Sequence, residues 1–390
     1  MTPQGPSPAP SMGASGELQA QRQPRVLHFV TGGFSGATQV AVDLVAAHQL
    51  SGRFQAKLVL RRKRNTAAER VEALCARGLD VQVVAGWSHA ASIWELVRIC
   101  REFRPDVLIA HGFSEHLWGR YAGLLAKVPC LVHVEHNSRE RYTRWRLAQA
   151  LWLSRRTQAT VGCSEGVRQS LLQRGFPAET TRAICNGIRL TPYLPAPPAL
   201  AQREPVIVMA ARFARQKDHG TLLRALALLR ERGLTPQLRL AGGGKASAQK
   251  AARQLCEKLG LQQQVQFLGL CDNVPQLLRE SRICVLSTHY EGMPLSLIEG
   301  MAAGCAVVAS RVIGVQEIID HGVNGLLAEH ASPESMADAF ELLLRDSAMA
   351  ARLAAAARCV ALEKYSQERM TREYEDLFDT LLDQAPGVSA

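Results

Sequence analysis

Two carboxylates, Glu291 and Glu299, stand eight residues apart in the segment THYEGMPLSLIEGMAAGCAVVAS (288–310). Gly292 permits a close turn after Glu291, and Pro294 suits the first turn of an apolar helix. The free backbone N–H groups at the start of that helix can hold phosphate or sugar oxygens. Glu291 can accept hydrogen bonds from sugar hydroxyls, and Glu299, two turns into the helix, can accept them from a ribose diol. Taken alone, Glu299 is also compatible with a charge on a helix surface.

Two cations lie upstream of these carboxylates, in the segment AARFARQKD (210–218). Arg212 and Lys217 fall at the end of an expected strand and near the start of the next helix. Arginine offers a planar fork of donors and lysine a compact charge, so the pair could converge on a diphosphate. As an isolated pair they would more often be two solvated charges on a loop.

A glycine-rich loop, TGGFSGATQ (31–39), follows the first expected strand and precedes a helix. Its backbone, including Gly36, can approach an anion bound at the helix N-terminus. A dinucleotide fold would place Asp or Glu about 20 residues further on, at the end of the second strand. That strand runs instead into RRKR (61–64), which disfavours NAD and gives NADP little support. A tight turn that needs glycine is the structural alternative.

The elements that must position these residues alternate between short β-branched runs and helical patterns, which is typical of parallel sheets built from βαβ units. The runs cover residues 25–30, 56–60, 80–84, 106–110, 130–134 and 159–163, and then 205–210, 237–242, 265–269, 283–287 and 305–310. Four prolines between 192 and 198 separate the two sets. Since ligands bind beyond the carboxyl ends of parallel strands, two such domains would share a site in the cleft between them.

The predicted fold class is therefore α/β, with two Rossmann-like parallel-sheet domains that face a cleft, followed by C-terminal helices. The N-terminal stretch is rich in Pro, Gly, Ser and Ala and cannot bury a core, so a disordered tail is expected there. The expected boundaries are 1–24 for the tail, 25–190 for the N-terminal domain, 191–204 for the linker, 205–365 for the C-terminal domain, and 366–390 for a final helix and tail that packs back toward the N-terminal domain.

Composition bears on which kinds of site and which cellular location the protein can have. The chain has 390 residues and a net charge of +11, and residues 1–200 hold 25 basic and 13 acidic side chains, so the excess lies in the first half. The ten cysteines stand singly, without metal-ligand spacing, which disfavours a zinc site or a disulfide framework and favours the cytoplasm. No apolar run has the length of a membrane span, and the N-terminus lacks a signal-peptide pattern, so a soluble or peripheral protein is expected.

The spacing from Arg212 to Glu299 resembles that of the retaining glycosyltransferases of family 4, which have the GT-B fold. The similarity extends from about Arg25 to Leu382. It includes the glycine-rich first loop, NGI (186–188), LAGGG (240–244) and GVQEIIDHGVNGLLAE (314–329).

The resemblance implies roles for the donor-side residues. Arg212 and Lys217 would bind the donor diphosphate, Glu291 would hold hydroxyls of the transferred sugar, and Glu299 would bind the nucleotide ribose. Gly36 would approach the phosphates or the sugar from across the cleft. The remaining implied donor contacts are Gly292, Met293, Pro294, Leu295 and Ser296 at the phosphates and sugar, and Leu270 and Asn273 near the base.

The resemblance also implies a histidine beside the donor sugar, here His111 after the run DVLIA (106–110). A strand-end histidine with a purely structural role is the alternative. Many relatives have His-x-His at this position, whereas this chain reads His111-Gly112-Phe113. His136 and Asn137, at the next strand end, would face the acceptor.

The implied reaction is metal-independent transfer of a sugar from a nucleotide sugar with retention of anomeric configuration. No D-x-D motif stands in the expected places, and no cofactor or metal is expected. The two cations would neutralise the leaving UDP or GDP instead. The segment EGMPLSLIE resembles that of family members acting on UDP-N-acetylhexosamines more than that of GDP-mannose users, and this resemblance implies a UDP-sugar donor.

The acceptor is expected to be a lipid-linked saccharide of lipopolysaccharide, O-antigen or exopolysaccharide assembly, received by the basic N-terminal domain. In the segment 138–156, arginines alternate with aromatic residues, and Trp145, Ala148, Leu151 and Trp152 share one helix face. This pattern suits an anionic membrane surface on the cytoplasmic side. An internal helix that packs Trp152 into the domain is the alternative.

Three other functions are compatible with parts of the sequence. Nucleic-acid binding would use the basic clusters but leave the donor-site residues unexplained. Another GT-B enzyme, such as a sugar-nucleotide epimerase or a glycogen synthase, would share the fold. A non-catalytic relative would bind the nucleotide sugar without forming product.

Overall fold

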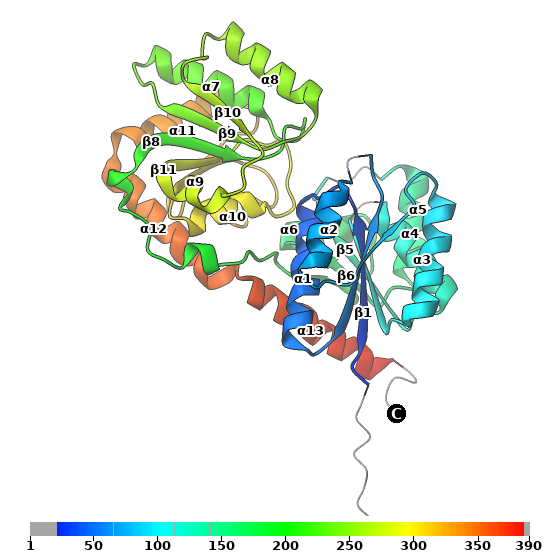
Figure 1. Ribbon diagram of the computed structural model, residues 1–390. Helices are drawn as coiled ribbons and strands as arrows, with labels where there is room; N and C mark the ends of the chain where they lie inside the picture. The colour runs from blue at the N-terminus through cyan, green and yellow to red at the C-terminus, as the bar shows by residue number, and fades with distance from the viewer. Residues whose placement is uncertain (1–21, 65, 113, 140–141, 386–390) are drawn as a thin grey trace, which may run out of the picture.

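The structure is a computed structural model that describes residues 22–64, 66–112, 114–139 and 142–385. Most of the expected N-terminal tail therefore lies outside the described residues. The described chain forms two α/β domains that lie side by side (Figure 1). Each domain contains one parallel sheet covered by helices, as the alternation of strand and helix patterns predicts.

The N-terminal domain contains a seven-stranded sheet in the order β3-β2-β1-β4-β5-β6-β7. Its strands are β1 (Arg25–Thr31), β2 (Gln55–Arg61), β3 (Val81–Val84), β4 (Val107–His111), β5 (Cys130–Glu135), β6 (Ala159–Gly162) and β7 (Thr181–Ala183). Its helices are α1 (Gly36–Ser51), α2 (Ala68–Ala76), α3 (His89–Phe103), α4 (Glu115–Ala126), α5 (Arg144–Ser154) and α6 (Glu165–Gln173). The strand order reverses direction between β1 and β4, which is where an open parallel sheet binds its ligands.

The C-terminal domain repeats this plan with a six-stranded sheet in the order β10-β9-β8-β11-β12-β13. Its strands are β8 (Glu204–Ala210), β9 (Gln237–Ala241), β10 (Val265–Gly269), β11 (Ser281–Leu286), β12 (Ala306–Ser310) and β13 (Leu326–Ala328). Its helices are α7 (His219–Glu231), α8 (Ala246–Lys258), α9 (Val274–Glu280), α10 (Leu295–Ala302), α11 (Pro333–Arg345) and α12 (Ser347–Lys364). Between the domains, the proline-rich segment forms two short 3-10 turns, Thr191–Tyr193 and Leu200–Gln202.

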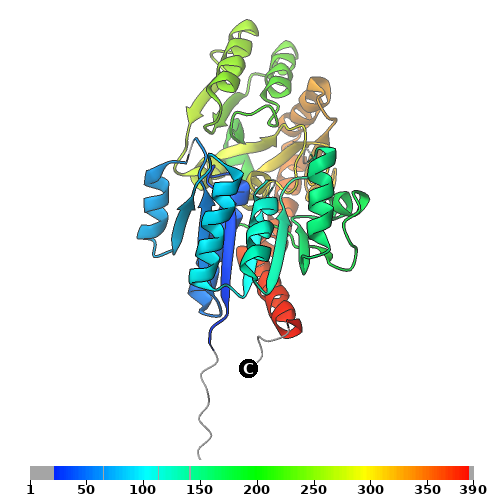
Figure 2. The same ribbon diagram turned by 90° about the vertical axis from the view of Figure 1, so that its right-hand side faces the viewer.

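The last helix, α13 (Gln367–Gln384), leaves the C-terminal domain and packs against the N-terminal sheet (Figures 1 and 2). Its apolar residues, among them Tyr374 and Phe378, share a core cluster with Val26 of β1 and Leu44 of α1. The apolar side chains on α13 recur every three to four residues, so one face of the helix is buried. Through α13, the end of the chain contributes to the core of the first domain.

The pairing of neighbouring strands determines which strand ends lie beside each other at the site. β1 pairs with β4, and β4 pairs with β5 through His111 and Val134, so the residues after these strands emerge at one edge of the sheet. In the second domain β8 and β11 are neighbours, which brings the residues after Ala210 close to those after Leu286. The predicted GT-B architecture of two facing Rossmann-like domains is confirmed.

Candidate active site

A cavity of about 750 Å³ lies between the two domains, where the carboxyl ends of both sheets meet. Its wall includes the N-terminal turns of two helices, α1 at Gly36 and α10 at Leu295. The unpaired backbone N–H groups and the positive dipole ends of both helices favour a bound anion. Of the predicted site residues, the cavity lining includes Gly36, His111, His136, Asn137, Arg212, Lys217, Glu291, Met293, Pro294, Leu295, Ser296 and Glu299.

Lys217 and Glu291 form an ion pair in the wall of this cavity. Lys217 Nζ lies 2.6 Å from Glu291 Oε1, and Thr288 Oγ1 donates to the same oxygen at 2.8 Å. Both charged side chains are largely buried, so each depends on the other for its charge to be compensated. The lysine that would meet a diphosphate is thus paired with the carboxylate that would meet a sugar.

Arg212 is the less restrained of the two predicted phosphate-binding cations. Its side chain is exposed, and it donates one long hydrogen bond, 3.3 Å from Nη2 to Gln216 Oε1. Gln216 in turn donates from Nε2 to the carbonyl oxygen of Tyr290 at 2.8 Å, which ties the loop after β8 to the loop after β11. The guanidinium can therefore turn toward a ligand without breaking a buried contact.

Glu299 lies on α10 and faces α1 of the other domain. Burial, with a smaller contribution from the nearby carboxylate of Asp43 on α1, raises the pKa of Glu299 to about 7. Burial likewise raises the pKa of Asp43 to about 6. Two carboxylates that share a poorly solvated site resist ionising together. Hydroxyl donors of a ribose would stabilise the charged form of Glu299.

Gly292 does not line the cavity but allows the two domains to approach each other. A Cβ atom at this position would lie 2.3 Å from the carbonyl oxygen of His136 and 2.8 Å from Cys163 Sγ, both in the N-terminal domain. Ser138 Oγ also donates to the carbonyl oxygen of Glu291 at 2.5 Å. Only glycine fits this contact, which sets the width of the cleft beside the Lys217–Glu291 pair.

Two sequence profiles match the chain, Glycosyltransferase Family 4 over residues 34–191 and Glycosyl transferases group 1 over residues 194–360. The chain belongs to the group 1 glycosyltransferases. The putative glycosyltransferase EpsD of Bacillus subtilis is 29% identical to it over 245 residues, which cover 60% of this chain and 63% of EpsD. The lipopolysaccharide core biosynthesis glycosyltransferase LpsD of Rhizobium meliloti is 25% identical over 289 residues, or 73% of this chain and 78% of LpsD.

A solved structure of HepE from Anabaena, in complex with UDP-glucose, superposes on this glycosyltransferase with a TM-score of 0.81. The match covers 91% of this chain and 99% of HepE, at 22% sequence identity. At that level of identity the similarity establishes the fold. The matched segment spans 63% of the length of EpsD.

His111 and His136 of the glycosyltransferase are in contact with each other. His111 Nδ1 lies 3.2 Å from His136 Nε2, and His111 Nε2 lies 3.1 Å from His28 Nδ1 on β1. Both ring nitrogens of His111 therefore have histidine partners. Burial lowers the pKa of His136 to about 4 and that of His111 well below its ordinary value, so both rings are neutral. A direct contact of His111 with a donor sugar stays a prediction, and it would have to replace one of these partners.

Two residues that were predicted to lie near the nucleotide base do not line the cavity. Leu270 is 70% exposed and packs beside Gly243, and Asn273 caps α9 by accepting from the backbone N–H of Gln276 at 3.1 Å. Their contact with a nucleotide base stays a prediction. Among the lining residues that the sequence did not assign to the site are two charged ones, Lys63 after β2 and Glu115 in the first turn of α4. They are paired at 2.6 Å.

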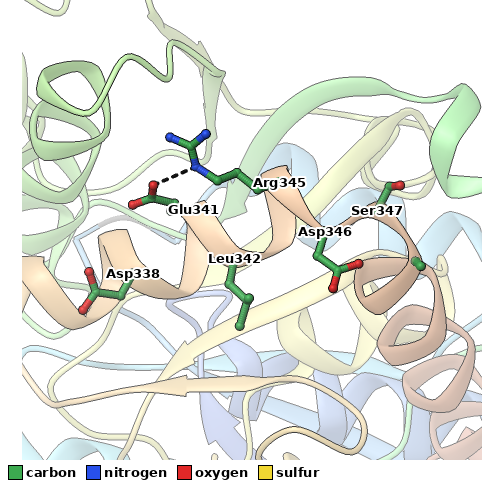
Figure 3. Close-up of a pocket in the computed structure, with 7 residues that line it drawn as sticks. Asp338, Glu341, Leu342, Arg345, Asp346 and Ser347 are labelled. Atoms are coloured by element: carbon green, nitrogen blue, oxygen red, sulfur yellow. Dashed lines mark hydrogen bonds and ion pairs between the residues drawn. The ribbon is translucent and has the colours of Figure 1, made fainter.

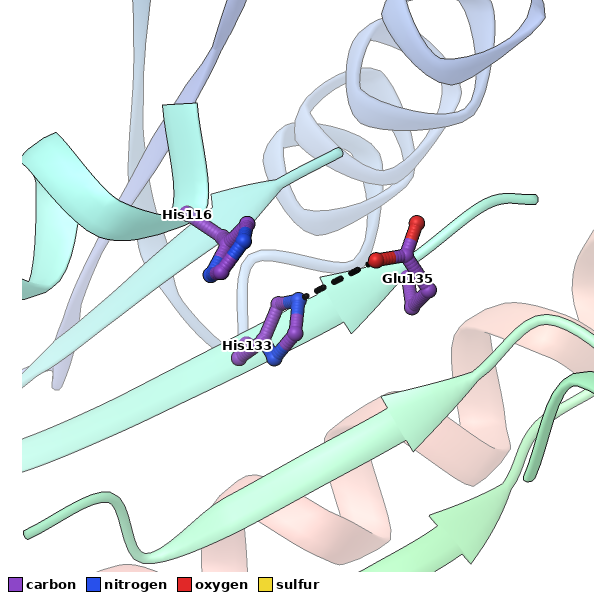
Figure 4. Close-up of side chains that lie close together, drawn as sticks. All are labelled: His116, His133 and Glu135. Atoms are coloured by element: carbon purple, nitrogen blue, oxygen red, sulfur yellow. Dashed lines mark ion pairs between the residues drawn. The ribbon is translucent and has the colours of Figure 1, made fainter. Parts of the chain in front are cut away.

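A cluster of His116, His133 and Glu135 lies behind the cleft, with ligand atoms within 4.8 Å of one another (Figure 4). Arg120 donates to His116 Nδ1 at 2.6 Å, which places the ring proton of His116 on Nε2, where a metal would need a lone pair. Tyr142 O–H lies 3.2 Å from both His116 Nε2 and Glu135 Oε2. Through His116 and Tyr142, these contacts connect the buried charges of Arg120 and Glu135. The arrangement fits such a hydrogen-bond network better than a metal site.

A second hollow lies on the surface of α11, far from the cleft in the fold. It is lined by Asp338, Glu341, Leu342, Arg345, Asp346, Ser347 and Ala348, and its ion pair, Arg345 to Glu341 at 2.8 Å, lies along one helix (Figure 3). It shares no residue with the interdomain cavity. None of the predicted donor residues lines this hollow.

Proposed function

We propose that this protein transfers a sugar from a UDP-sugar to a saccharide with retention of anomeric configuration and without a metal ion. One observation carries the proposal: the N-termini of α1 and α10, the cations Arg212 and Lys217, and the carboxylates Glu291 and Glu299 line a single interdomain cavity. The cations and helix ends suit a diphosphate, and the carboxylates suit the hydroxyls on either side of it. UDP fits this division, with the ribose at Glu299 and the transferred sugar at Glu291.

In the proposed reaction the acceptor hydroxyl attacks the anomeric carbon from the face that the diphosphate leaves. The bond from that carbon to the phosphate oxygen breaks, and the bond to the acceptor oxygen forms. The hydroxyl proton passes to an oxygen of the departing diphosphate. Arg212, Lys217 and the N-terminus of α10 stabilise the charge that develops on the leaving group. Glu291 holds the transferred sugar in place.

The donor is tested by thermal stabilisation with a panel of UDP- and GDP-sugars, because a ligand at 100 times its Kd adds about 2.7 kcal/mol to stability. UDP-N-acetylhexosamines are expected to stabilise most. Release of nucleotide and formation of a glycosylated product then establish transfer, and binding without product would identify a non-catalytic relative. Glu299→Ala should lower kcat/KM by about 30- to 150-fold. Glu363→Ala, an exposed glutamate of α12, is the matched control.

The proposed acceptor is a lipid-linked saccharide at the inner surface of a membrane. Trp145 and Trp152 of α5 are 75% and 47% exposed, and the guanidinium of Arg156 lies 4.0 Å from the ring centre of Trp152. The buried face of α5 consists of Ala150 and Leu153 instead, so the alternative of a buried Trp152 is wrong. Exposed tryptophans beside arginines suit the interface of an anionic bilayer. None of the described helices has the length and apolarity to cross a bilayer.

Flotation with liposomes tests this surface. The protein should float with vesicles that contain anionic lipid and not with neutral vesicles, and the double variant Trp145→Ala/Trp152→Ala should bind the anionic vesicles more weakly. Trp94→Ala, which removes a tryptophan on α3 that is 66% exposed, is the control. Equal binding to both vesicle types, or to neither, would overturn the membrane proposal while leaving the donor proposal intact.

A further inference from the structure

A second pair of opposite charges, Lys63 and Glu115, lies in the wall that the N-terminal domain gives to the interdomain cavity. Lys63 Nζ lies 2.6 Å from Glu115 Oε1, and Ser114 Oγ donates to the other carboxylate oxygen at 2.9 Å. Lys63 follows β2 and Glu115 follows β4, and these two strands flank β1 in the sheet. The pair therefore spans the point where the strand order reverses, and open parallel sheets bind ligands in the crevice at this point.

The backbone of Lys63 is fixed against the glycine-rich loop after β1. Thr66 Oγ1 accepts from the backbone N–H of Lys63 at 2.7 Å and donates to the carbonyl oxygen of Gly32 at 2.9 Å. The backbone N–H of Gly32 donates to the carbonyl oxygen of Arg61 at 2.8 Å. A Cβ atom on Gly32 would lie 2.8 Å from that carbonyl oxygen and 2.8 Å from Thr66 Oγ1, so glycine allows the two loops to touch. The backbone position of Lys63 in the cavity wall is thus determined by the fold.

Glu115 has two cationic partners, although one positive charge is enough to compensate its own. Arg61 Nη1 lies 3.4 Å from Glu115 Oε1, and Arg61 Nη2 donates to His89 Nδ1 at 2.9 Å. The side chains of Arg61 and Glu115 are 6% and 3% exposed, so these two form a buried ion pair. The side chain of Lys63 is 33% exposed and lines the cavity, whereas Arg61 does not. Lys63 therefore presents the excess positive charge of this group to the cavity.

The pKa of His89 responds to the same excess of positive charge. Partial desolvation lowers the pKa of His89, and the charges of Arg61, Arg146 and Lys63 act in the same direction. The carboxylate of Glu115 opposes them. Three cations around one carboxylate create a positive potential that favours a bound anion.

We propose that Lys63 is a specificity-determining residue that binds a phosphate group on the acceptor saccharide. The cations expected to meet the donor diphosphate, Arg212 and Lys217, belong to the other domain, so Lys63 is a separate cation on the opposite wall. A lysine ammonium has three donors, and the ones not used by Glu115 can meet phosphate oxygens. A phosphate ester carries almost two negative charges and three acceptor oxygens, so it gains more from this excess charge than a carboxylate would.

The assignment of the phosphate to an acceptor rests on the proposed function, whereas the binding of phosphate at Lys63 does not. The experiment is isothermal titration of glucose 1-phosphate into the full chain saturated with UDP, so that the donor phosphate site is filled. The wild-type protein should bind glucose 1-phosphate more tightly than methyl glucoside, which has no phosphate. Lys63→Gln should weaken the binding of glucose 1-phosphate by about tenfold, the effect of one hydrogen bond to a charged group. It should leave the affinity for UDP unchanged.

Two variants separate a site at Lys63 from general attraction to the basic segment 61–64. Arg62→Gln removes an exposed charge that does not line the cavity, and it should leave the binding of glucose 1-phosphate unchanged. Lys63→Arg keeps the charge and should keep most of the binding. Equal weakening by Lys63→Gln and Arg62→Gln would overturn the proposal. A loss of UDP affinity in Lys63→Gln would also overturn it, because the lysine would then serve the donor.

Two further measurements keep the test independent of the donor proposal and of the folding of any variant. If UDP does not bind, the donor proposal fails, and the effect of Lys63→Gln on glucose 1-phosphate is measured without UDP. In a crystal of the wild-type protein soaked with glucose 1-phosphate and UDP, a phosphate that is not part of UDP should lie within hydrogen-bond distance of Lys63 Nζ. A sugar phosphate bound away from Lys63 would overturn the proposal.

Discussion

Replacement of Gly292 by alanine should widen the cleft and weaken nucleotide binding. The added Cβ would lie 2.3 Å from the carbonyl oxygen of His136, about 1 Å closer than ordinary van der Waals contact at 3.4 Å. A backbone oxygen cannot swing aside as a side chain can, so the domains must separate or the loop must shift. Overpacking of this kind costs about 1 to 3 kcal/mol. If that strain opposes the closed cleft, it weakens affinity for UDP by about 5- to 150-fold.

The assay is isothermal titration of UDP together with thermal unfolding. Gly220→Ala is the matched control for an added methyl group outside the cleft, since the nearest neighbour of a Cβ there would be the flexible end of Arg224 at 3.1 Å. Because Gly220 lies in the first turn of α7, that variant should keep or raise the unfolding temperature. Wild-type UDP affinity in a folded Gly292→Ala protein would refute the argument that this contact sets the width of the cleft.

Three further predictions concern the charged residues of the cavity. Arg212→Ala should change the free energy of unfolding by less than about 0.5 kcal/mol, because the side chain is exposed, yet lower UDP affinity by about 1.5 to 3 kcal/mol in titration; a loss of stability without a loss of affinity would contradict its role. Lys217→Met should cost about 3 kcal/mol in urea unfolding, since it leaves Glu291 buried without its cation, and adding Glu291→Gln should recover part of that loss. The raised pKa of Glu299, about 7, means that the folded protein binds its proton more tightly than the unfolded chain. Stability should therefore fall as pH rises from about 4.5 to 7, by at most about 3 kcal/mol, and UDP affinity should rise over the same range. Glu299→Gln should flatten both profiles.

The donor residues could be predicted from the sequence because each stands in a local pattern that fixes its place. Arg212 follows a strand, Glu291 follows another, and Glu299 lies two turns into a helix that begins after a proline. Neighbouring parallel strands bring such residues to one edge of a sheet whatever the rest of the chain does. The two-domain fold could be predicted for the same reason, from strand runs alternating with helices.

Contacts between segments that lie far apart in the sequence could not be predicted, because no local sequence pattern marks them. His48 and Glu375 are separated by 327 residues, and they meet because α13 returns to the first domain. Asp43 comes to face Glu299 only through the packing of one domain on the other. Lys63 belonged to a visible basic cluster, but its partner Glu115 could be identified only from the strand order. His111 could be located from its strand, whereas the occupation of both its ring nitrogens by histidines could not.

A crystal structure with a bound UDP-sugar is the most direct test of the proposed donor site. The diphosphate is expected between Arg212 and Lys217 at the N-terminus of α10, the ribose hydroxyls on Glu299, and the sugar on Glu291. Formation of that complex should separate Lys217 from its present bond to Glu291. A nucleotide bound elsewhere, such as in the hollow on α11, or a diphosphate that meets neither cation, would contradict it.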